Sequence, residues 1–430
     1  MKKHIDKAVH IYKNQGVKTL SVKGTRFAKT KVLEVVAPNR HDKAYRELWK
    51  EYEYVANPIF QITEADIVAS KKSLQATEPG EPIKTANWFV PNFNHLSFGG
   101  IFTIFRFIEK FSKEGVFNRI IIYDHPSFDV EGLHKQIKDT FPELTNYEIV
   151  IYDLNNDDIN DLPECDIAIC SFWVSAYLLL KFNKTKRKYY FVQDYEPLFY
   201  PGGSTYALAE STYRFGFRGL VNTPGLLAAV NQRHGMEGIS FIPAVDQSVY
   251  FPDPKKKNDK VKIFFYARPA NPRNAFNLGI VIIKQLIEKY GDKIEVVTAG
   301  ADWKPMAFGL EGKITNLGLL GSISEVADLY RSCDIGFVYM LSKHPSYQPF
   351  EFMASGMATV TNNNEDNLWL LKDGKNCLLA EPSPAAVAEK ISMLIDDDKL
   401  RRKIADNGLK TLGYTWPQQT DAIWNDIQSN

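Results

Sequence analysis

The stretch Val261–Arg273, VKIFFYARPANPR, decides how the second half of the chain is interpreted. Its first six residues are β-branched or aromatic except for Lys262, a composition typical of a buried strand. A basic turn with two prolines follows, and the spacing of apolar residues predicts a helix over Ala275–Tyr290. A parallel strand, a loop and a helix form one unit of an open α/β sheet, in which ligands bind outside the carboxyl ends of the strands.

The turn within this stretch carries two arginines, Arg268 and Arg273. A guanidinium group holds phosphate oxygens through paired N–H donors, so two of them at the ligand-binding edge of a sheet suit a diphosphate. The alternative is that both side chains face solvent or pair with nearby acids. We interpret the pair as a diphosphate site.

Bulk properties limit the class of protein. A chain of 430 residues exceeds one ordinary core, which predicts two or three domains, and 44% hydrophobic and 24% charged residues are typical of a soluble protein. The net charge of +1 argues against a nucleic-acid partner. Nine basic residues nevertheless lie between Lys2 and Lys31, against one acid, Asp6. This arm either contacts an anionic membrane surface or is a solvated terminus.

The cysteines and the hydropathy bear on the compartment. The four cysteines lack metal-ligand spacing and are interpreted as buried thiols of a protein in a reducing compartment; they are Cys165, Cys170, Cys333 and Cys377. The basic start is not followed by the apolar core of a signal peptide, and no apolar run is long enough to span a bilayer. We therefore expect a cytoplasmic protein, attached at most peripherally to the inner face of the membrane.

Strands and helices alternate in two series, which lie in residues 85–250 and 251–413. This alternation predicts an α/β protein with two doubly wound, Rossmann-like domains that face a central cleft. Residues 1–84 are predicted to form a mostly helical extension, and residues 414–430 a terminal helix. Neither G-x-G-x-x-G nor the P-loop pattern occurs, which argues against a dinucleotide site and against nucleoside triphosphate hydrolysis.

A second candidate site is Lys343–Gly356, KHPSYQPFEFMASG. Pro349 suits the first turn of a helix, where free amides and the helix dipole attract phosphate. Glu351 falls in the same turn, and its carboxylate is placed to accept hydrogen bonds from ribose hydroxyls. The alternative is that Glu351 only caps its own helix.

A third candidate site follows the predicted strand Lys188–Val192. Acids among aromatic rings suit sugar binding, because carboxylates accept from hydroxyls and rings cover the apolar sugar face. Asp194 or Glu196 is expected to orient or deprotonate an acceptor hydroxyl, and the predicted acceptor-binding residues are His95, Tyr195, Phe199, Tyr200 and Tyr206. The alternatives are that both acids cap local N–H groups and that His95 is an ordinary hydrogen-bonded loop histidine.

These motifs, in this order, resemble GT-B glycosyltransferases of the retaining, sucrose-synthase-like class over about residues 87–430. The resembling segments are the glycine loop Phe98-Gly99-Gly100, the Arg-x4-Lys pair at Arg268 and Arg273, the nucleobase loop Leu317-Gly318, the second half of the E-x7-E region at 346–356, and Thr415-Trp416. The resemblance implies that the helix after Thr415 crosses back to the first domain. It also implies retention of anomeric configuration, and donor binding by Gly99, Gly100, Leu317, Gly318, Ser346, Tyr347 and Glu351.

A narrower resemblance is to the rhamnosyltransferase group typified by WsaF. It rests on Phe191–Pro197 with Phe199–Pro201, on Tyr213-Arg214, on Ala267–Ala275, and on His344–Tyr347. It implies transfer of L-rhamnose from dTDP-β-L-rhamnose to a growing cell-surface glycan, free or lipid-linked. Arg268 and Arg273 are expected to stabilise the leaving diphosphate, so no metal or other cofactor is expected. Two departures from the wider family occur. Arg273 stands where the family has the Lys of its Arg-x4-Lys pair, which keeps the charge. Lys343 stands where the family has the first Glu of E-x7-E, so the donor hexose cannot be carried over from the family.

Three alternatives stay open. The chain is a transferase of another nucleotide-activated hexose, a sugar-nucleotide epimerase of the same fold, or a non-catalytic relative that binds glycan. The aromatic loop Asp194–Tyr206 argues against an epimerase, which needs no acceptor subsite. Lys343 in place of a carboxylate is the feature that favours a non-catalytic relative.

Overall fold

The computed structural model describes residues 43–74, 82–93, 96, 99–123, 128–254, 258–344 and 346–429. The chain divides into two units, residues 1–61 and 62–430. Of the first unit, the described part contains helix α2 (Lys43–Val55) and the 3-10 turn η2 (Pro58–Phe60), which is capped by Asn57 through a 2.9 Å bond from the amide of Ile59. The basic arm Lys2–Lys31 lies outside the described residues, so its membrane role stays a prediction.

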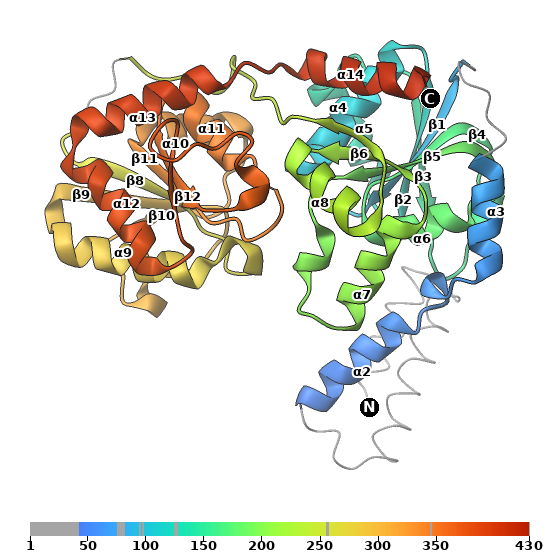
Figure 1. Cartoon of the computed structure of the whole chain (residues 1–430), viewed down its shortest axis with the longest axis horizontal. Coiled ribbons are helices and arrows are strands. Elements are labelled where there is room, and N and C mark those ends of the chain that lie inside the picture. Colours follow the sequence, from blue (N-terminus) through green and yellow to red (C-terminus); the bar gives the residue numbers. More distant parts are fainter. Residues whose placement is uncertain are drawn as a thin grey trace. The chain divides into compact units, whose positions relative to one another are not determined.

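The second unit contains two fully parallel sheets (Figure 1). We call each sheet, together with the helices packed on it, a lobe, and number the two lobes in chain order. The first-lobe sheet has the order β3-β2-β1-β4-β5-β6-β7. Its strands are β1 (Thr85–Pro91), β2 (Phe117–Tyr123), β3 (Tyr147–Tyr152), β4 (Cys165–Cys170), β5 (Thr185–Val192), β6 (Arg218–Asn222) and β7 (Gly238–Phe241). Its helices are α3 (Glu64–Leu74), α4 (Gly99–Lys113), α5 (Val130–Thr140), α6 (Trp173–Lys181), α7 (Ser204–Ser211), α8 (Pro224–His234) and α14 (Trp416–Ser429), with 3-10 turns η3 (Ile159–Asp161), η4 (Glu196–Phe199) and η5 (Thr212–Arg214).

The second-lobe sheet has the order β10-β9-β8-β11-β12-β13. Its strands are β8 (Val261–Tyr266), β9 (Ile294–Ala299), β10 (Thr315–Asn316), β11 (Ile335–Val338), β12 (Ala358–Asn362) and β13 (Leu378–Ala380). Its helices are α9 (Phe276–Tyr290), α10 (Ile323–Ser332), α11 (Gln348–Ala354), α12 (Pro384–Asp396) and α13 (Asp398–Thr411), with 3-10 turns η6 (Pro272–Asn274), η7 (Gly291–Lys293), η8 (Pro305–Phe308) and η9 (Glu365–Asn367). The prediction of two doubly wound parallel sheets is confirmed.

The burial of both faces of strand β8 explains why polar and apolar residues do not alternate along it. Ile263 and Phe265 belong to the core cluster that includes α9 and α12, whereas Phe264 belongs to the cluster on the opposite face with residues of α10 and α11. Both faces of a central parallel strand are covered, so the three consecutive positions Ile263, Phe264 and Phe265 are all apolar. Helix α9 approaches closely because Gly279 has no side chain, and a Cβ there would lie 2.1 Å from the ring of Phe265.

The terminal helix α14 belongs to the first lobe. Ile423, Trp424 and Ile427 are part of the first-lobe core, where the Trp424 ring lies 5.0 Å from that of Phe111. An ion pair of 2.7 Å joins Asp426 to Arg218 of β6. The chain therefore leaves the first lobe after β7, builds the second lobe, and returns.

Three elements differ from the sequence prediction. Helix α8 was missed because Pro224 and Gly225 indicate a turn, although Thr223 in fact caps the helix and Pro224 is its first residue. Strand β13 was missed because it is short. Helix α3 was assigned to the N-terminal extension, but it packs against β5 and α6, where Lys188 Nζ donates to Ser70 Oγ at 3.0 Å. None of the helices in the described ranges combines the length and apolarity needed to cross a bilayer.

Candidate functional site

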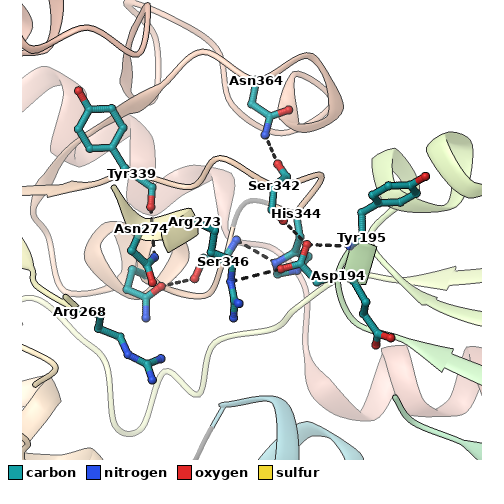
Figure 2. Close-up of polar contacts among 12 residues, drawn as sticks. Asp194, Tyr195, Arg268, Arg273, Asn274, Tyr339, Ser342, His344, Ser346 and Asn364 are labelled. Atoms are coloured by element: carbon teal, nitrogen blue, oxygen red, sulfur yellow. Dashed lines mark hydrogen bonds and ion pairs between the residues drawn. The ribbon is translucent and has the colours of Figure 1, made fainter. Parts of the chain in front are cut away.

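The loops that follow β5, β8 and β11 meet at one place, which we call the lobe junction (Figure 2). Asp194, two residues after β5, lies with Oδ2 3.6 Å from Arg273 Nε of the loop after β8. Its other oxygen accepts hydrogen bonds from Ser342 Oγ of the loop after β11 and, at 2.7 Å, from the amide of Tyr195. One buried first-lobe carboxylate is thus shared between two loops of the second lobe.

Arg273 is the central cation of the junction. Its guanidinium carbon lies 4.3 Å from the centre of the Phe199 ring, and burial lowers its pKa while the charge of Asp194 opposes that shift. The 3.6 Å contact with Asp194 is an ion pair but too long for a hydrogen bond. Within the described residues, Arg273 Nε has no hydrogen-bond partner.

Arg268 lies on the exposed side of the same loop. Its Nη1 donates to the hydroxyl of Tyr266 at 3.4 Å, and its charge adds to the lowering of the Arg273 pKa. Two guanidinium groups therefore repel one another near the carboxylate of Asp194. Such an arrangement favours binding of a further anion.

Asparagines hold the second-lobe loops in place. Asn274 Nδ2 donates to the carbonyl of Tyr339 at 3.3 Å, and the amide of Leu341 donates to the carbonyl of Arg273 at 2.9 Å. At the end of β12, Asn362 bonds both backbone groups of Met340, accepting at 2.8 Å and donating at 3.0 Å. The loop after β11 is thereby tied to both neighbouring strands.

Backbone strain gathers at the carboxyl ends of the strands. Within the described residues, the non-glycine residues with positive φ are Thr223, Ala275 and Ser346, at 85°, 46° and 67°. They follow β6, β8 and β11 respectively. Each such conformation costs on the order of 1–3 kcal/mol and persists only where the surroundings enforce it, as functional loops do.

His344 is the second buried donor of the junction. Its side chain is 4% exposed, and Nδ1 accepts the amide hydrogen of Ser346 at 2.9 Å. Burial, with the nearby charge of Arg273, lowers the His344 pKa to about 3, so the ring is neutral. Nε2 is buried without a hydrogen-bond partner among the described residues.

The structure corrects the expected position of Glu196. Its side chain is 3% exposed, and Oε2 accepts from the amide of Trp173 at 2.7 Å and from the hydroxyl of Tyr190 at 2.8 Å. Burial raises its pKa to about 8, although these bonds oppose the shift. Glu196 therefore binds the start of α6 inside the first lobe, as the capping alternative requires. Asp194, whose pKa is also raised by burial, is the acid that reaches the junction.

Three of the predicted acceptor-binding aromatics have side-chain hydrogen bonds within the first lobe. Tyr195 is 2% exposed, stacks on Tyr213 and His234, and has its hydroxyl within 2.8 Å of His234 Nε2. Tyr206 donates to Glu210 at 3.4 Å. The hydroxyl of Tyr200 accepts from Trp173 Nε1 at 3.0 Å. Phe199 contacts the junction through its ring, which lies against Arg273, whereas Tyr195 contacts it through its backbone amide. His95 lies outside the described residues.

Two of the predicted donor-binding residues, Gly99 and Tyr347, lie where the two lobes meet. The Tyr347 hydroxyl lies 2.6 Å from Thr103 Oγ1 and accepts from Asn222 Nδ2 at 3.2 Å. A Cβ at Gly99 would lie 3.4 Å from the Tyr347 ring, and the carbonyl of Gly100 accepts from Gln193 Nε2 at 3.0 Å. These contacts place Gly99, at the start of α4, beside Tyr347, at the end of the loop after β11.

The remaining predicted donor residues lie along the second lobe. Leu317 is 44% exposed, and Gly318 has a φ of 68° that permits its turn after β10. Burial raises the Glu351 pKa to about 7, opposed by a hydrogen bond from Tyr250; no ion pair between Glu351 and either arginine occurs in the described part. Ser346 Oγ donates to Gln348 Oε1.

An ion pair explains how the chain accommodates Lys343 at the position where the wider family has a glutamate. Lys343 Nζ lies 2.6 Å from Asp366 Oδ2 of η9, so its charge is neutralised within the second lobe. A Cβ at Gly225 of α8 would lie 1.8 Å from the carbonyl oxygen of Asp366, which shows how closely the lobes approach here. In the described ranges, no cluster of three or more histidine, cysteine or carboxylate side chains is placed to hold a metal ion.

Comparison with known proteins identifies the family. Residues 86–220 match the N-terminal domain of WsaF and residues 261–392 match its C-terminal domain, in the same order as the two sheets. The chain belongs to the WsaF family. The O-antigen biosynthesis protein RfbC of Myxococcus xanthus is 41% identical over 347 residues, which are 80% of this chain but only 27% of that relative.

Solved structures show that this WsaF-family chain has the GT-B fold. Sucrose-phosphate synthase from Thermosynechococcus elongatus superposes with a TM-score of 0.63 at 9% identity, covering 80% of this chain and 98% of that one. HepE of Anabaena, in complex with UDP and glucose, superposes with a TM-score of 0.63 at 14% identity, covering 81% and 100%. TarM of S. aureus gives 0.65 at 11% identity, covering 81% and 100%. At these identities the likeness establishes the fold alone.

Sequence reasoning missed Ser342 and Asn274 as parts of this site, whereas the run Asn362–Glu365, which follows a predicted strand, was expected to line the crevice. Asn274 follows Arg273 directly, and Asn362 ends β12, so both stand where ligands are expected in such sheets. Ser342 carries no comparable signal, because its partner, Asp194, is 148 positions away along the chain.

Proposed function

We propose that this chain is a glycosyltransferase of cell-surface polysaccharide biosynthesis that transfers L-rhamnose from dTDP-β-L-rhamnose. The observation that carries the proposal is the pair Arg268 and Arg273 at the carboxyl end of β8, with Arg273 reaching Asp194 of the first lobe at 3.6 Å. Membership in the WsaF family and the likeness to an O-antigen biosynthesis protein support it. HepE, of the same fold, binds UDP, UDP-glucose and glucose.

The proposed reaction breaks the bond between the anomeric carbon and the diphosphate oxygen. Negative charge then grows on the leaving diphosphate, and cations held in place beforehand stabilise it most in a water-poor site. Arg273 fits this role because it is partly buried, is oriented by Asp194 and Phe199, and keeps an unused N–H. Arg268 supplies a second, more exposed charge.

The acceptor hydroxyl enters from the first lobe in this proposal. Asp194 is the carboxylate that reaches the junction, so it either orients that hydroxyl or holds Arg273 until the donor binds. The resemblance to retaining enzymes implies that the acceptor approaches on the side of the leaving group. A metal ion is not required, because the arginines carry the positive charge, so transfer is expected to persist in EDTA.

An epimerase is disfavoured by the position of Glu196. Epimerisation needs an acid and a base on the two sides of the sugar, and Glu196 is turned toward Trp173 and Tyr190. Among the described residues, Asp194 is the first-lobe carboxylate that contacts the second lobe at Arg273 and Ser342.

The test is incubation of the purified chain with dTDP-rhamnose and a rhamnose-terminated oligosaccharide, followed by mass spectrometry. Extension of the acceptor by one deoxyhexose, with release of dTDP, supports the proposal. Extension from UDP-glucose in a parallel reaction, without extension from dTDP-rhamnose, would refute the donor assignment while keeping the activity. Binding of dTDP without any turnover would indicate a non-catalytic relative.

A further inference from the structure

We infer that His344 is a further donor-binding residue, whose Nε2–H donates a hydrogen bond to the leaving diphosphate. This inference rests on the proposed function, since it names a second protein contact for the same leaving group. His344 follows β11, whereas the arginines follow β8, so the diphosphate would be held from two neighbouring strands of the second-lobe sheet.

The hydrogen bond from Ser346 fixes the tautomer of His344. The amide of Ser346 can only donate, so Nδ1, which lies 2.9 Å away, must accept and carries no proton. A neutral imidazole then has its proton on Nε2. The buried ring therefore presents an N–H donor, and not an acceptor, at the atom left without a partner.

The backbone of the loop enforces this arrangement. Ser346 has a φ of 67°, a conformation that non-glycine residues rarely adopt, and this residue supplies the amide bonded to Nδ1. The Ser346 side chain is also tied, through Oγ, to Gln348 of α11. A strained residue that is held on both sides indicates that the orientation of the imidazole matters more than the relaxed backbone.

The surroundings of Nε2 select an oxygen-bearing anion. A buried donor without an acceptor loses the free energy of a hydrogen bond, so such groups usually have a partner in the functional complex. Arg273, whose charge acts on His344, is also partly buried and keeps an unpaired Nε–H. Figure 2 shows both side chains gathered around Asp194, and the ion pair of 3.6 Å places Arg273 next to that carboxylate. Two donors and a positive charge exclude a cation and suit a phosphate oxygen.

Two substitutions separate the proposed contact from support of the loop. In His344→Asn the side-chain oxygen occupies roughly the place of Nδ1 and still accepts from Ser346, but the Nε2 donor is lost. In His344→Gln the amide nitrogen lies near the place of Nε2 and still donates, but the acceptor for Ser346 is lost. Both variants and the wild-type chain are titrated with dTDP and with dTMP by calorimetry, after their melting temperatures have been compared.

We expect His344→Asn to bind dTDP about tenfold more weakly, with dTMP affinity changed by less than about twofold, because one charge-assisted hydrogen bond to the terminal phosphate is lost. His344→Gln is expected to stay within about threefold of wild type for dTDP. The inference is overturned if His344→Asn binds dTDP as wild type does, or if the Gln variant alone loses affinity, since either result assigns His344 to loop support. A wild-type chain that binds neither dTDP nor UDP would instead overturn the proposed function, and the role of His344 with it.

Discussion

The loop after β5 and the loops after β8 and β11 carry similar sets of polar and aromatic side chains but use them differently. In the first-lobe loop, Glu196 and Tyr195 find partners within their own lobe, at Trp173, Tyr190 and His234. In the second-lobe loops, Arg273 Nε and His344 Nε2 are buried without hydrogen-bond partners among the described residues.

This difference separates residues that build the site from residues that remain available to a ligand. A polar side chain near the carboxyl end of a strand is a candidate by position, but its unused hydrogen-bonding capacity decides whether it can bind anything more. By that criterion the second lobe carries the donor chemistry. The first lobe contributes Asp194, whose carboxylate is shared across the junction.

The largest effect is expected at Arg273. Arg273→Met removes the partly buried charge that stabilises the leaving diphosphate, and kcat for rhamnose transfer should fall about 10²–10³-fold. Arg268→Met is the matched control: its guanidinium is exposed and screened by solvent, so the loss should be nearer to tenfold. Equal losses for both variants, measured by dTDP release, would show that burial does not distinguish the two arginines.

A smaller effect is expected for Asp194→Asn, in which the affinity for dTDP should increase. The carboxylate competes with a diphosphate for Arg273 and repels it, so its removal should tighten dTDP binding about fivefold to tenfold. Turnover should nevertheless fall, since Asp194 also orients Arg273 or the acceptor. Calorimetry with dTDP together with kcat measurements tests both parts. Weaker dTDP binding by Asp194→Asn would contradict the competition.

The burial of Glu196 within the first lobe can be tested through the pH dependence of stability. Its pKa is raised from 4.5 to about 8 in the folded chain, so folding retains a proton that the unfolded chain releases. Stability from this group is therefore present below about pH 4.5 and is lost as pH rises toward 8. Glu196→Gln has no such loss, so its melting temperature relative to wild type should rise by about 5 °C between about pH 5.5 and about pH 8.5. A difference that is independent of pH would show that Glu196 is ionised in the fold.

The smallest effect is expected at Tyr195. Tyr195→Phe removes the hydroxyl that contacts Glu210 and His234 but keeps the stacked ring, so it should lower the free energy of unfolding by about 1 kcal/mol. Transfer activity should remain within about twofold of wild type, because the side chain lies inside the first lobe. Urea denaturation and a transfer assay check the two values. A large loss of activity with unchanged stability would restore the acceptor-binding role.

Much of the fold follows from local sequence. Strand β8 has the predicted bounds Val261–Tyr266 because a continuous run of β-branched and aromatic residues ends at a proline-containing turn. Helix α10 likewise begins where the local sequence Ser322-x-x-Glu325 indicates a helix start, since Ser322 caps it by accepting from the amide of Glu325. Helix α8 escaped prediction because its Pro-Gly start indicates a turn, and the close approach to Asp366 that requires Gly225 is visible only in three dimensions.

The sequence was sufficient to predict where the cationic residues of the candidate site lie. It was not sufficient to predict which way the acidic side chains point. Arg268 and Arg273 are placed by the strand that precedes them, so the sequence was sufficient to locate both. The orientation of Glu196 depends on the amide of Trp173, 23 positions earlier in the chain, and that of Asp194 on Ser342 and Arg273 of the other lobe. Choices between long-range partners of this kind depend on packing and leave no periodic signal in the sequence.

The position of α14 has a consequence for biosynthesis. Ile423, Trp424 and Ile427 fill the first-lobe core, although most of that lobe is translated before residue 250. On the ribosome, the nascent first lobe must therefore wait for the whole second lobe to emerge before its hydrophobic interior can be sealed. Helix α14 is thus the last element that the first lobe receives.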